Sequence, residues 1–255
     1  MNLPLSPELM VVFLLVFARV GTMMALMPGL GERAMPMRVR LGVALLLTMI
    51  LFPLHRPLYA IDLARPAGVF LTLFMEIAVG FTLGMAGRIA VSALQTAGVV
   101  IANAMGLGFA MQVDPTQGQQ GAVIGTFLTL TGIAIIFASD LHHLVIAAIS
   151  DSFSIIRPGA LPASGDAAQF LTGVMSRAFL VAIQLSAPFL VFALVFNIGL
   201  GILSKLMPQM QVFFVAMPVT IGVGFLILLL VIGVMMAHYA GHLESLLGEI
   251  AVNRR

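Results

Sequence analysis

The stretch NAMGLGFAMQVDPTQGQQG, residues 103–121, separates two long apolar runs in a chain that is 61% hydrophobic. It is too rich in Gly, Gln and turn-forming residues to be a membrane helix. Irregular backbone between membrane segments is tolerated only outside the bilayer, inside protein, or along a water-filled path. We therefore expect an all-α membrane protein whose central loop either leaves the membrane or helps to form a pathway, and the second possibility points to transport.

The composition supports a membrane protein. The mean hydropathy is +1.13, and only 9% of the 255 residues are charged, whereas soluble domains carry about 25%. This length has room for about six membrane-spanning helices. No cysteine is present, which excludes disulfides and thiolate chemistry. The net charge of +2 comes from scattered Lys and Arg residues, so we expect no nucleic-acid partner.

The apolar runs predict the helices and their interruptions. Pro53 is expected to close the second run, Pro188 and Pro218 to kink the fifth and sixth, and a polar helical tail to follow as residues 238–255. Broken helices of this kind are typical of transport pathways. The predicted runs are 9–27, 41–52, 66–85 with a possible extension to 102, 122–138 followed by a weakly amphipathic stretch, 170–203, and 212–236.

Arg19 is the most informative single charge, because it lies in the middle of the first apolar run. An arginine at the centre of a membrane helix costs about 2.5–3.5 kcal/mol on insertion scales, so it is expected to find a partner. Glu76, the other deeply placed charge, is the natural candidate. A structural ion pair between the first and third runs is the favoured interpretation, and a direct role in passage stays open.

Catalytic and metal-binding patterns are missing from the sequence. His142 and His143 follow Asp140, but adjacent residues on a helix point about 100° apart, so a structural or surface role is favoured over shared metal ligation. No zinc-protease, serine-hydrolase or phosphate-loop motif occurs. We therefore expect no catalytic residue, cofactor or metal, and no enzymatic activity.

Short motifs along the whole chain resemble the FliR family, the flagellar type III export-gate proteins whose injectisome counterpart is SctT. The fragments are weak singly, and their order and spacing carry the resemblance. They are Arg19-Val20-Gly21, Pro28-Gly29-Leu30-Gly31-Glu32-Arg33, Glu76-Ile77 with Gly80 and Gly84, Gly108-Phe109-Ala110, Asp114-Pro115, Asp140-Leu141-His142-His143, Ala187-Pro188, Pro208-Gln209-Met210-Gln211-Val212-Phe213, and Met217-Pro218.

The resemblance implies a non-enzymatic core subunit of a protein export gate. Residues 1–165 would be a FliP-like part, 166–237 a FliQ-like hairpin, and 238–255 a polar tail. Membrane-protein helical hairpins with broken, kinked helices would join FliP and FliQ in a closed hetero-oligomeric ring in the bacterial inner membrane. That ring would lie within the flagellar basal body, raised toward the periplasmic side. Further implied partners are FlhA, FlhB, membrane lipid and the unfolded flagellar proteins that are secreted. The turn of the hairpin would contain Lys205, Pro208 and Gln209.

The central loop resembles the plug segment of that family. Glycines give such a segment backbone freedom, apolar side chains can exclude water, and the Asp-Pro pair stiffens the turn between them. A passive connector between two helices is the open alternative. The residues assigned to gating are Met105, Gly106, Gly108, Phe109, Met111, Asp114, Pro115 and Gly118.

Two other functions stay open at this stage. An injectisome subunit of the same family would share these motifs. A self-contained secondary transporter is the second alternative, but such proteins carry paired repeats and polar substrate groups at mid-membrane. The sequence shows no clear repeat and few buried polar groups.

Overall fold

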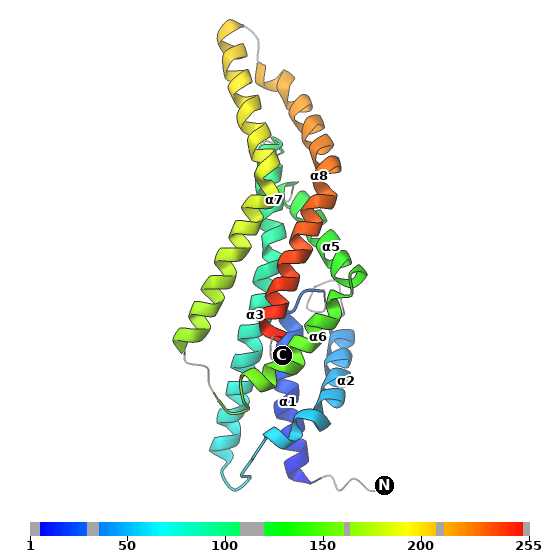
Figure 1. Ribbon diagram of the computed structural model, residues 1–255, viewed down its shortest axis with the longest axis vertical. Coiled ribbons are helices and arrows are strands. Elements are labelled where there is room, and N and C mark those ends of the chain that lie inside the picture. Colours follow the sequence, from blue (N-terminus) through cyan, green and yellow to red (C-terminus); the bar gives the residue numbers. More distant parts are fainter. Residues whose placement is uncertain (1–5, 30–35, 108–119, 161–163, 208–211, 252–255) are drawn as a thin grey trace. The chain divides into compact units, whose positions relative to one another are not determined.

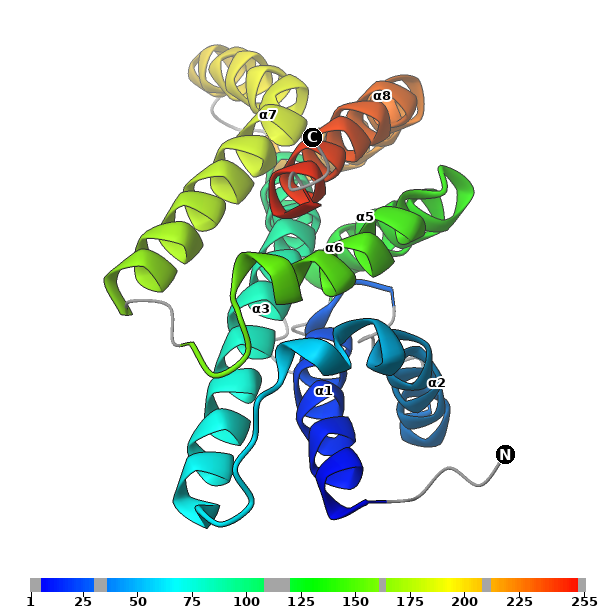
Figure 2. The same ribbon diagram turned by 60° about the horizontal axis from the view of Figure 1, so that its bottom comes forward.

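The computed structural model describes residues 6–29, 36–107, 120–160, 164–207 and 212–251. Within these ranges the chain is helical and contains no strand (Figures 1 and 2). The elements are α1 (Pro7–Leu26), α2 (Met37–His55), the 3-10 helix η1 (Arg56–Leu58), α3 (Pro66–Ala104), α5 (Gln120–Ala138), α6 (Leu141–Ile155), α7 (Ser164–Leu206) and α8 (Val212–Ala251).

The predicted all-α membrane fold is confirmed. In the part of the chain that the structure describes, five helices are long and apolar enough to cross a membrane, and α5 with α6, bent by 80° at their junction, can supply a sixth span. Each apolar run became a helix, and the polar tail continues α8 as far as Ala251. The prediction that Pro53 closes the second run was wrong, because α2 includes Pro53 and ends at His55. A proline removes one backbone N–H donor from a helix. Because α2 ends two residues after Pro53, only its last turn is affected.

The described helices pack into two compact units. The first unit comprises residues 1–90, 136–175 and 243–255, and the second comprises 91–135 and 176–242. Each unit takes residues from both sides of position 165. The predicted division into FliP-like and FliQ-like parts concerns resemblance and not packing, and it stays a prediction.

In the first unit, a row of glycines on α3 lets α1 approach closely. A Cβ atom at Gly80 would lie 2.7 Å from the backbone oxygen of Arg19, and one at Gly84 would lie 2.9 Å from Leu26 Cβ. Gly87 continues the row, where a Cβ would meet the sulfur of Met27 at 2.8 Å. Small residues at this spacing are typical of tightly packed membrane helices. α1 also packs against α2, where the rings of Phe13 and Phe52 meet edge to face.

The second unit uses the same device between α3 and α5. A Cβ at Gly98 would collide with the backbone of Gly125, and one at Gly125 would meet the Gln95 amide. The Thr129 hydroxyl donates to Gln95 Oε1 at 3.4 Å beside this crossing. Close backbone approach therefore brings the few polar side chains of the two helices together.

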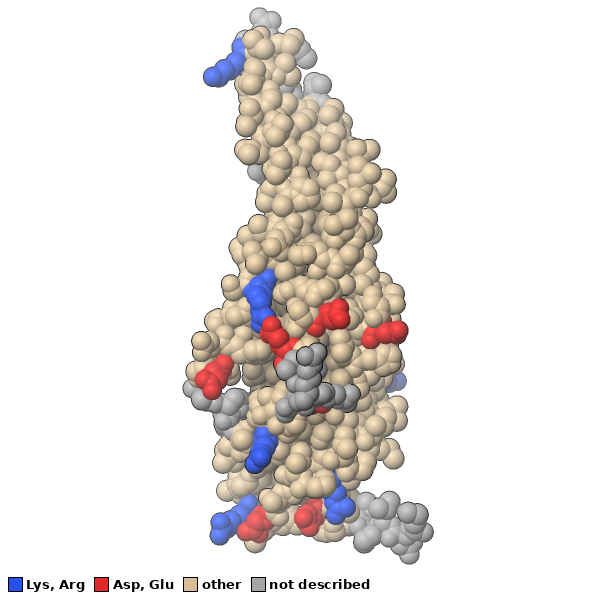
Figure 3. Space-filling view, in the orientation of Figure 1, with Lys and Arg blue, Asp and Glu red and all other residues tan. Residues whose placement is uncertain are grey.

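Large apolar side chains remain exposed along most of the helices. In the span of α2, only 17% of the most apolar window is buried inside the protein, and in that of α8 only 22%. The space-filling view shows a surface on which charged side chains are sparse (Figure 3). Such a surface needs lipid or other protein subunits to cover it.

The glycine row predicts that alanine substitutions at different glycines of α3 change the stability of the protein by different amounts. We expect Gly80→Ala to destabilise the protein by about 1–3 kcal/mol, because the new Cβ meets backbone that must move. Gly68→Ala, on the same helix with nothing within 4 Å of its Cβ, is the matched control and should be neutral or slightly stabilising. Thermal unfolding of both variants in detergent measures the difference, and equal midpoints would contradict the tight seam.

Candidate functional site

Most of the predicted plug lies outside the described residues, namely Gly108, Phe109, Met111, Asp114, Pro115 and Gly118. In the predicted hairpin turn, Pro208 and Gln209 also lie outside, while Lys205 is exposed in the last turn of α7. For these positions the structure adds no geometry, and their assigned roles stay predictions.

Met105 and Gly106, at the edge of the predicted plug, close the C-terminus of α3. Gly106 adopts a left-handed conformation with φ of 77°. Its N–H donates to Asn103 O at 3.0 Å, and the N–H of Leu107 donates to Ala102 O at 2.9 Å. These two bonds form a Schellman motif, which satisfies carbonyls that the helix end leaves free. Gly106 therefore has a defined local role as the residue that ends the helix.

The Met105 side chain is packed in the second unit. It has no exposed surface, and a Cβ built on Gly224 of α8 would lie 2.5 Å from Met105 Cγ. Gly224 thus leaves the space that Met105 occupies. The sequence analysis assigned Met105 to sealing a pore, and the structure places it as a contact between the end of α3 and α8.

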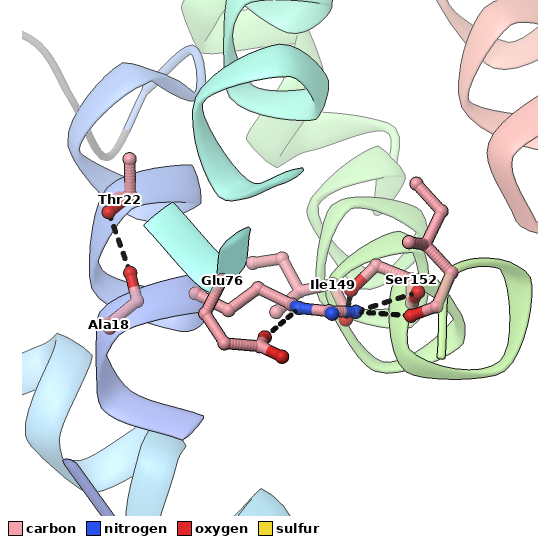
Figure 4. Close-up of polar contacts among 7 residues, drawn as sticks. Ala18, Thr22, Glu76, Ile149 and Ser152 are labelled. Carbon is pink, nitrogen blue, oxygen red and sulfur yellow. Dashed lines mark hydrogen bonds and ion pairs between the residues drawn. The ribbon is translucent and has the colours of Figure 1, made fainter. Parts of the chain in front are cut away.

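Arg19 and Glu76 meet in the interior of the first unit, and Figure 4 shows the dashed contact that the labelled Glu76 makes. Arg19 Nε lies 2.5 Å from Glu76 Oε2, and neither side chain has exposed surface. Glu76 precedes Gly80 by one helical turn, so the close approach that Gly80 permits brings the carboxylate within reach of α1. The pair joins α1 to α3, as the position of the two charges in the apolar runs suggested.

Arg19 has a second set of partners that the sequence analysis missed. Its Nη1 donates to Ser152 O and to Ile156 O, both at 2.9 Å. These carbonyls belong to the last turn and C-cap of α6, where a helix leaves its carbonyls free and its dipole favours a cation. One guanidinium therefore caps α6 and pairs with α3 (Figure 4). Backbone acceptors have no signature in a sequence, which is why only Glu76 could be anticipated.

Aromatic rings complete the surroundings of Arg19. Its Cζ lies 4.5 Å from the ring centroid of Phe153, a cation–π distance. The His55 ring stacks on the Phe153 ring with centroids 4.3 Å apart, and His55 Nε2 lies 3.3 Å from Ser150 Oγ. Burial, and then the nearby Glu76 carboxylate, raise the pKa of Tyr59, so its hydroxyl stays neutral beside the ion pair. These contacts join α1, α2, α3 and α6 around the Arg19 side chain.

Asp140, His142 and His143 cluster where α5 bends into α6. One ligand atom from each lies within 4.8 Å of the others, and the two imidazole rings are 4.1 Å apart. The two adjacent rings thus come closer than their angular separation on a helix suggests. The side chains of Asp140 and His143 are 80% and 71% exposed. Exposed groups of this kind are common without an ion, and we assign no metal to them.

Comparison with known proteins gives a consistent picture. The family model described as "Bacterial export proteins, family 1" matches residues 10–246. Flagellar biosynthetic protein FliR of Caulobacter vibrioides is 37% identical over 216 residues, which are 85% of this chain and 86% of that protein. FliR of Bacillus subtilis is 32% identical over 232 residues, or 89% and 88% of the two chains.

An injectisome protein is also similar. Yop proteins translocation protein T of Yersinia pestis is 27% identical over 205 residues, 78% of this chain and 77% of that protein. Because the family model and these relatives each span most of the sequence, the chain belongs to the bacterial export proteins of family 1, the family of the flagellar protein FliR.

Proposed function

We propose that the chain is a non-enzymatic core subunit of the flagellar type III export gate, which forms with FliP and FliQ the pore for unfolded flagellar proteins. Family membership makes it a membrane component of an export apparatus. The pore, its partners FliP, FliQ, FlhA and FlhB, and a position raised toward the periplasm belong to the proposal. The flagellar branch is preferred to the injectisome branch because identity to FliR of Caulobacter vibrioides exceeds that to the Yop protein.

The exposed apolar surface is the observation that carries this proposal. Leu229 and Leu230 of α8 are 77% and 73% exposed, and Leu194 and Val195 of α7 are 64% and 65% exposed. Side chains at adjacent positions point in different directions around a helix. Broad exposure of this kind is what a subunit needs when neighbouring subunits cover several of its faces.

Assembly provides the most direct test. We expect the chain expressed alone to be unstable, because 255 residues cannot bury this surface internally, and co-expressed FliP- and FliQ-like partners should rescue it as a large hetero-oligomer. Size-exclusion chromatography in detergent measures both states. A monodisperse, thermally stable monomer would count against the proposal.

The Arg19 network predicts how its substitutions rank. Removing one partner of a buried ion pair costs about 3–5 kcal/mol. Arg19→Glu should be worse than Arg19→Leu, because it sets a second carboxylate against Glu76. The swap Arg19→Glu with Glu76→Arg should recover assembly only in part, since a glutamate cannot donate to Ser152 O and Ile156 O.

Complex yield on native gels and swimming of complemented cells measure this ranking. Arg88→Leu removes an exposed arginine from α3 and serves as the control, with little expected change in yield. If the swap is no better than the worse single variant, the pairing does not support assembly.

The central loop is the proposed gate. A secretion pore must pass unfolded protein and still exclude ions at rest, which requires a segment that blocks the path and moves aside. We expect deletion of residues 108–119, with the helix end at Gly106 retained, to leave the complex assembled but the membrane permeable to small ions and solutes. Secretion should suffer less than the permeability barrier.

Membrane conductance and sensitivity of cells to small solutes report the leak, and native gels report assembly in parallel. A replacement of the same segment by a Gly/Ser linker of equal length separates the effect of sequence from that of length. A normally assembled complex in a tight membrane would show that the loop is only a connector.

A further inference from the structure

One methionine holds the end of α3 against α8 inside the second unit. Met105 has no exposed surface, and Gly224 of α8 is buried as well. The three atoms nearest to the position that a Cβ on Gly224 would take all belong to Met105, with Cγ, Cε and Cβ at 2.5, 2.9 and 3.2 Å. The side chain therefore packs around bare backbone, in a notch on α8 that only a glycine leaves open.

A second contact lies one helical turn earlier on α8. A Cβ on Gly106 would lie 3.9 Å from Thr220 Cγ2, so this methyl group lies beside the residue whose left-handed φ ends α3. Gly106 and Leu107 are hydrogen-bonded back to Asn103 and Ala102, which ties them to the helix end. Positions 220 and 224 share one face of α8. This face thus contacts the residues from which the rest of the central loop begins.

α8 bends at low cost in the same stretch. Pro218 lies inside the helix, where it removes a backbone donor. The Thr220 hydroxyl donates to Ala216 O at 2.9 Å, a bond of a kind that often bends helices. Gly222 and Gly224 add two residues of low helix propensity. Kinks in helices concentrate at such residues, so the part of α8 that contacts the end of α3 is also its most deformable part.

We propose that α8 sets the position of the central loop through the notch at Gly224. Because Met105 fills the notch, a change in the bend of α8 over residues 218–224 moves the end of α3 with it, and residues 108–119 continue from that end. The predicted FliQ-like hairpin is thereby coupled to the segment proposed as the gate. The consequence for export rests on the proposed gating role, whereas the coupling itself does not.

The test adds one methyl group to the notch. Gly224→Ala places a Cβ against Met105 Cγ and Cβ, atoms near the backbone that cannot swing away as the end of a side chain can. We expect the backbone amides of residues 101–107 to exchange hydrogen about tenfold faster, because overpacking loosens the helix end. The measurement is hydrogen exchange by mass spectrometry on the full chain, purified in detergent with the subunits that accompany it.

Gly222→Ala is the matched control. It makes the same stretch of α8 stiffer by one alanine, but its Cβ meets nothing within 4 Å, so exchange at residues 101–107 should stay unchanged. Adding Met105→Ala to Gly224→Ala should restore slow exchange in part, since it removes Cγ and Cε from the notch. A general loss of stability would not be repaired by shortening a second buried side chain.

Unchanged exchange in Gly224→Ala would overturn the proposal, as would a double variant that exchanges faster than Gly224→Ala alone. If Gly224→Ala is not recovered from the membrane, Met105→Ala decides, because it empties the notch without adding an atom. Exchange as slow as in the unmodified protein would then overturn the proposal.

Membrane conductance of cells that carry Gly224→Ala separates the coupling from the gating role. Faster exchange together with a leak supports both. Faster exchange in a tight membrane supports the coupling and contradicts the gating role of the loop.

Discussion

The burial of one guanidinium is the constraint on which the first unit depends. Arg19 lies in an apolar helix with no exposed surface, and an unpaired charge there is unfavourable. Its cost is offset by a carboxylate from α3 and by two carbonyls from the end of α6. Because these partners come from two segments other than α1, satisfying the charge requires three helices, α1, α3 and α6, to meet in one arrangement. A purely apolar contact would not be so selective, since apolar attraction is non-directional.

Glycine residues at the helix contacts allow the short separation between helices that this arrangement needs. Helices in lipid gain little from burying apolar side chains, because the surrounding chains are equally apolar, so packing and hydrogen bonds must hold them together. Gly80 allows α3 to contact the backbone at Arg19, one turn from Glu76, and the crossing of Gly98 with Gly125 brings Gln95 near Thr129. In each unit close backbone approach therefore accompanies a polar contact, and each stabilises the other.

The sequence was informative where the physical signal is local. Apolar runs predicted the helices, and the two deeply placed charges suggested the contact between Arg19 and Glu76 that the structure contains. The end of α2 was misplaced because Pro53 is tolerated so close to a helix terminus. The cap on α6 could not be predicted, because it uses backbone carbonyls at Ser152 and Ile156 that any residue would supply. Gly106 has a left-handed φ at the end of α3, a detail that the sequence analysis did not anticipate, and its gating role stays a prediction.

Lipid and neighbouring subunits both offer apolar atoms that can cover the exposed helices. Polar groups discriminate better, since each needs a partner of matching chemistry. Arg19 and Glu76 pair with each other inside the chain, while Arg19 Nη2 and Glu76 Oε1 are buried without a hydrogen-bond partner among the described residues. The described helices thus combine apolar faces that accept any apolar neighbour with an interior ion pair that accepts only a matched partner.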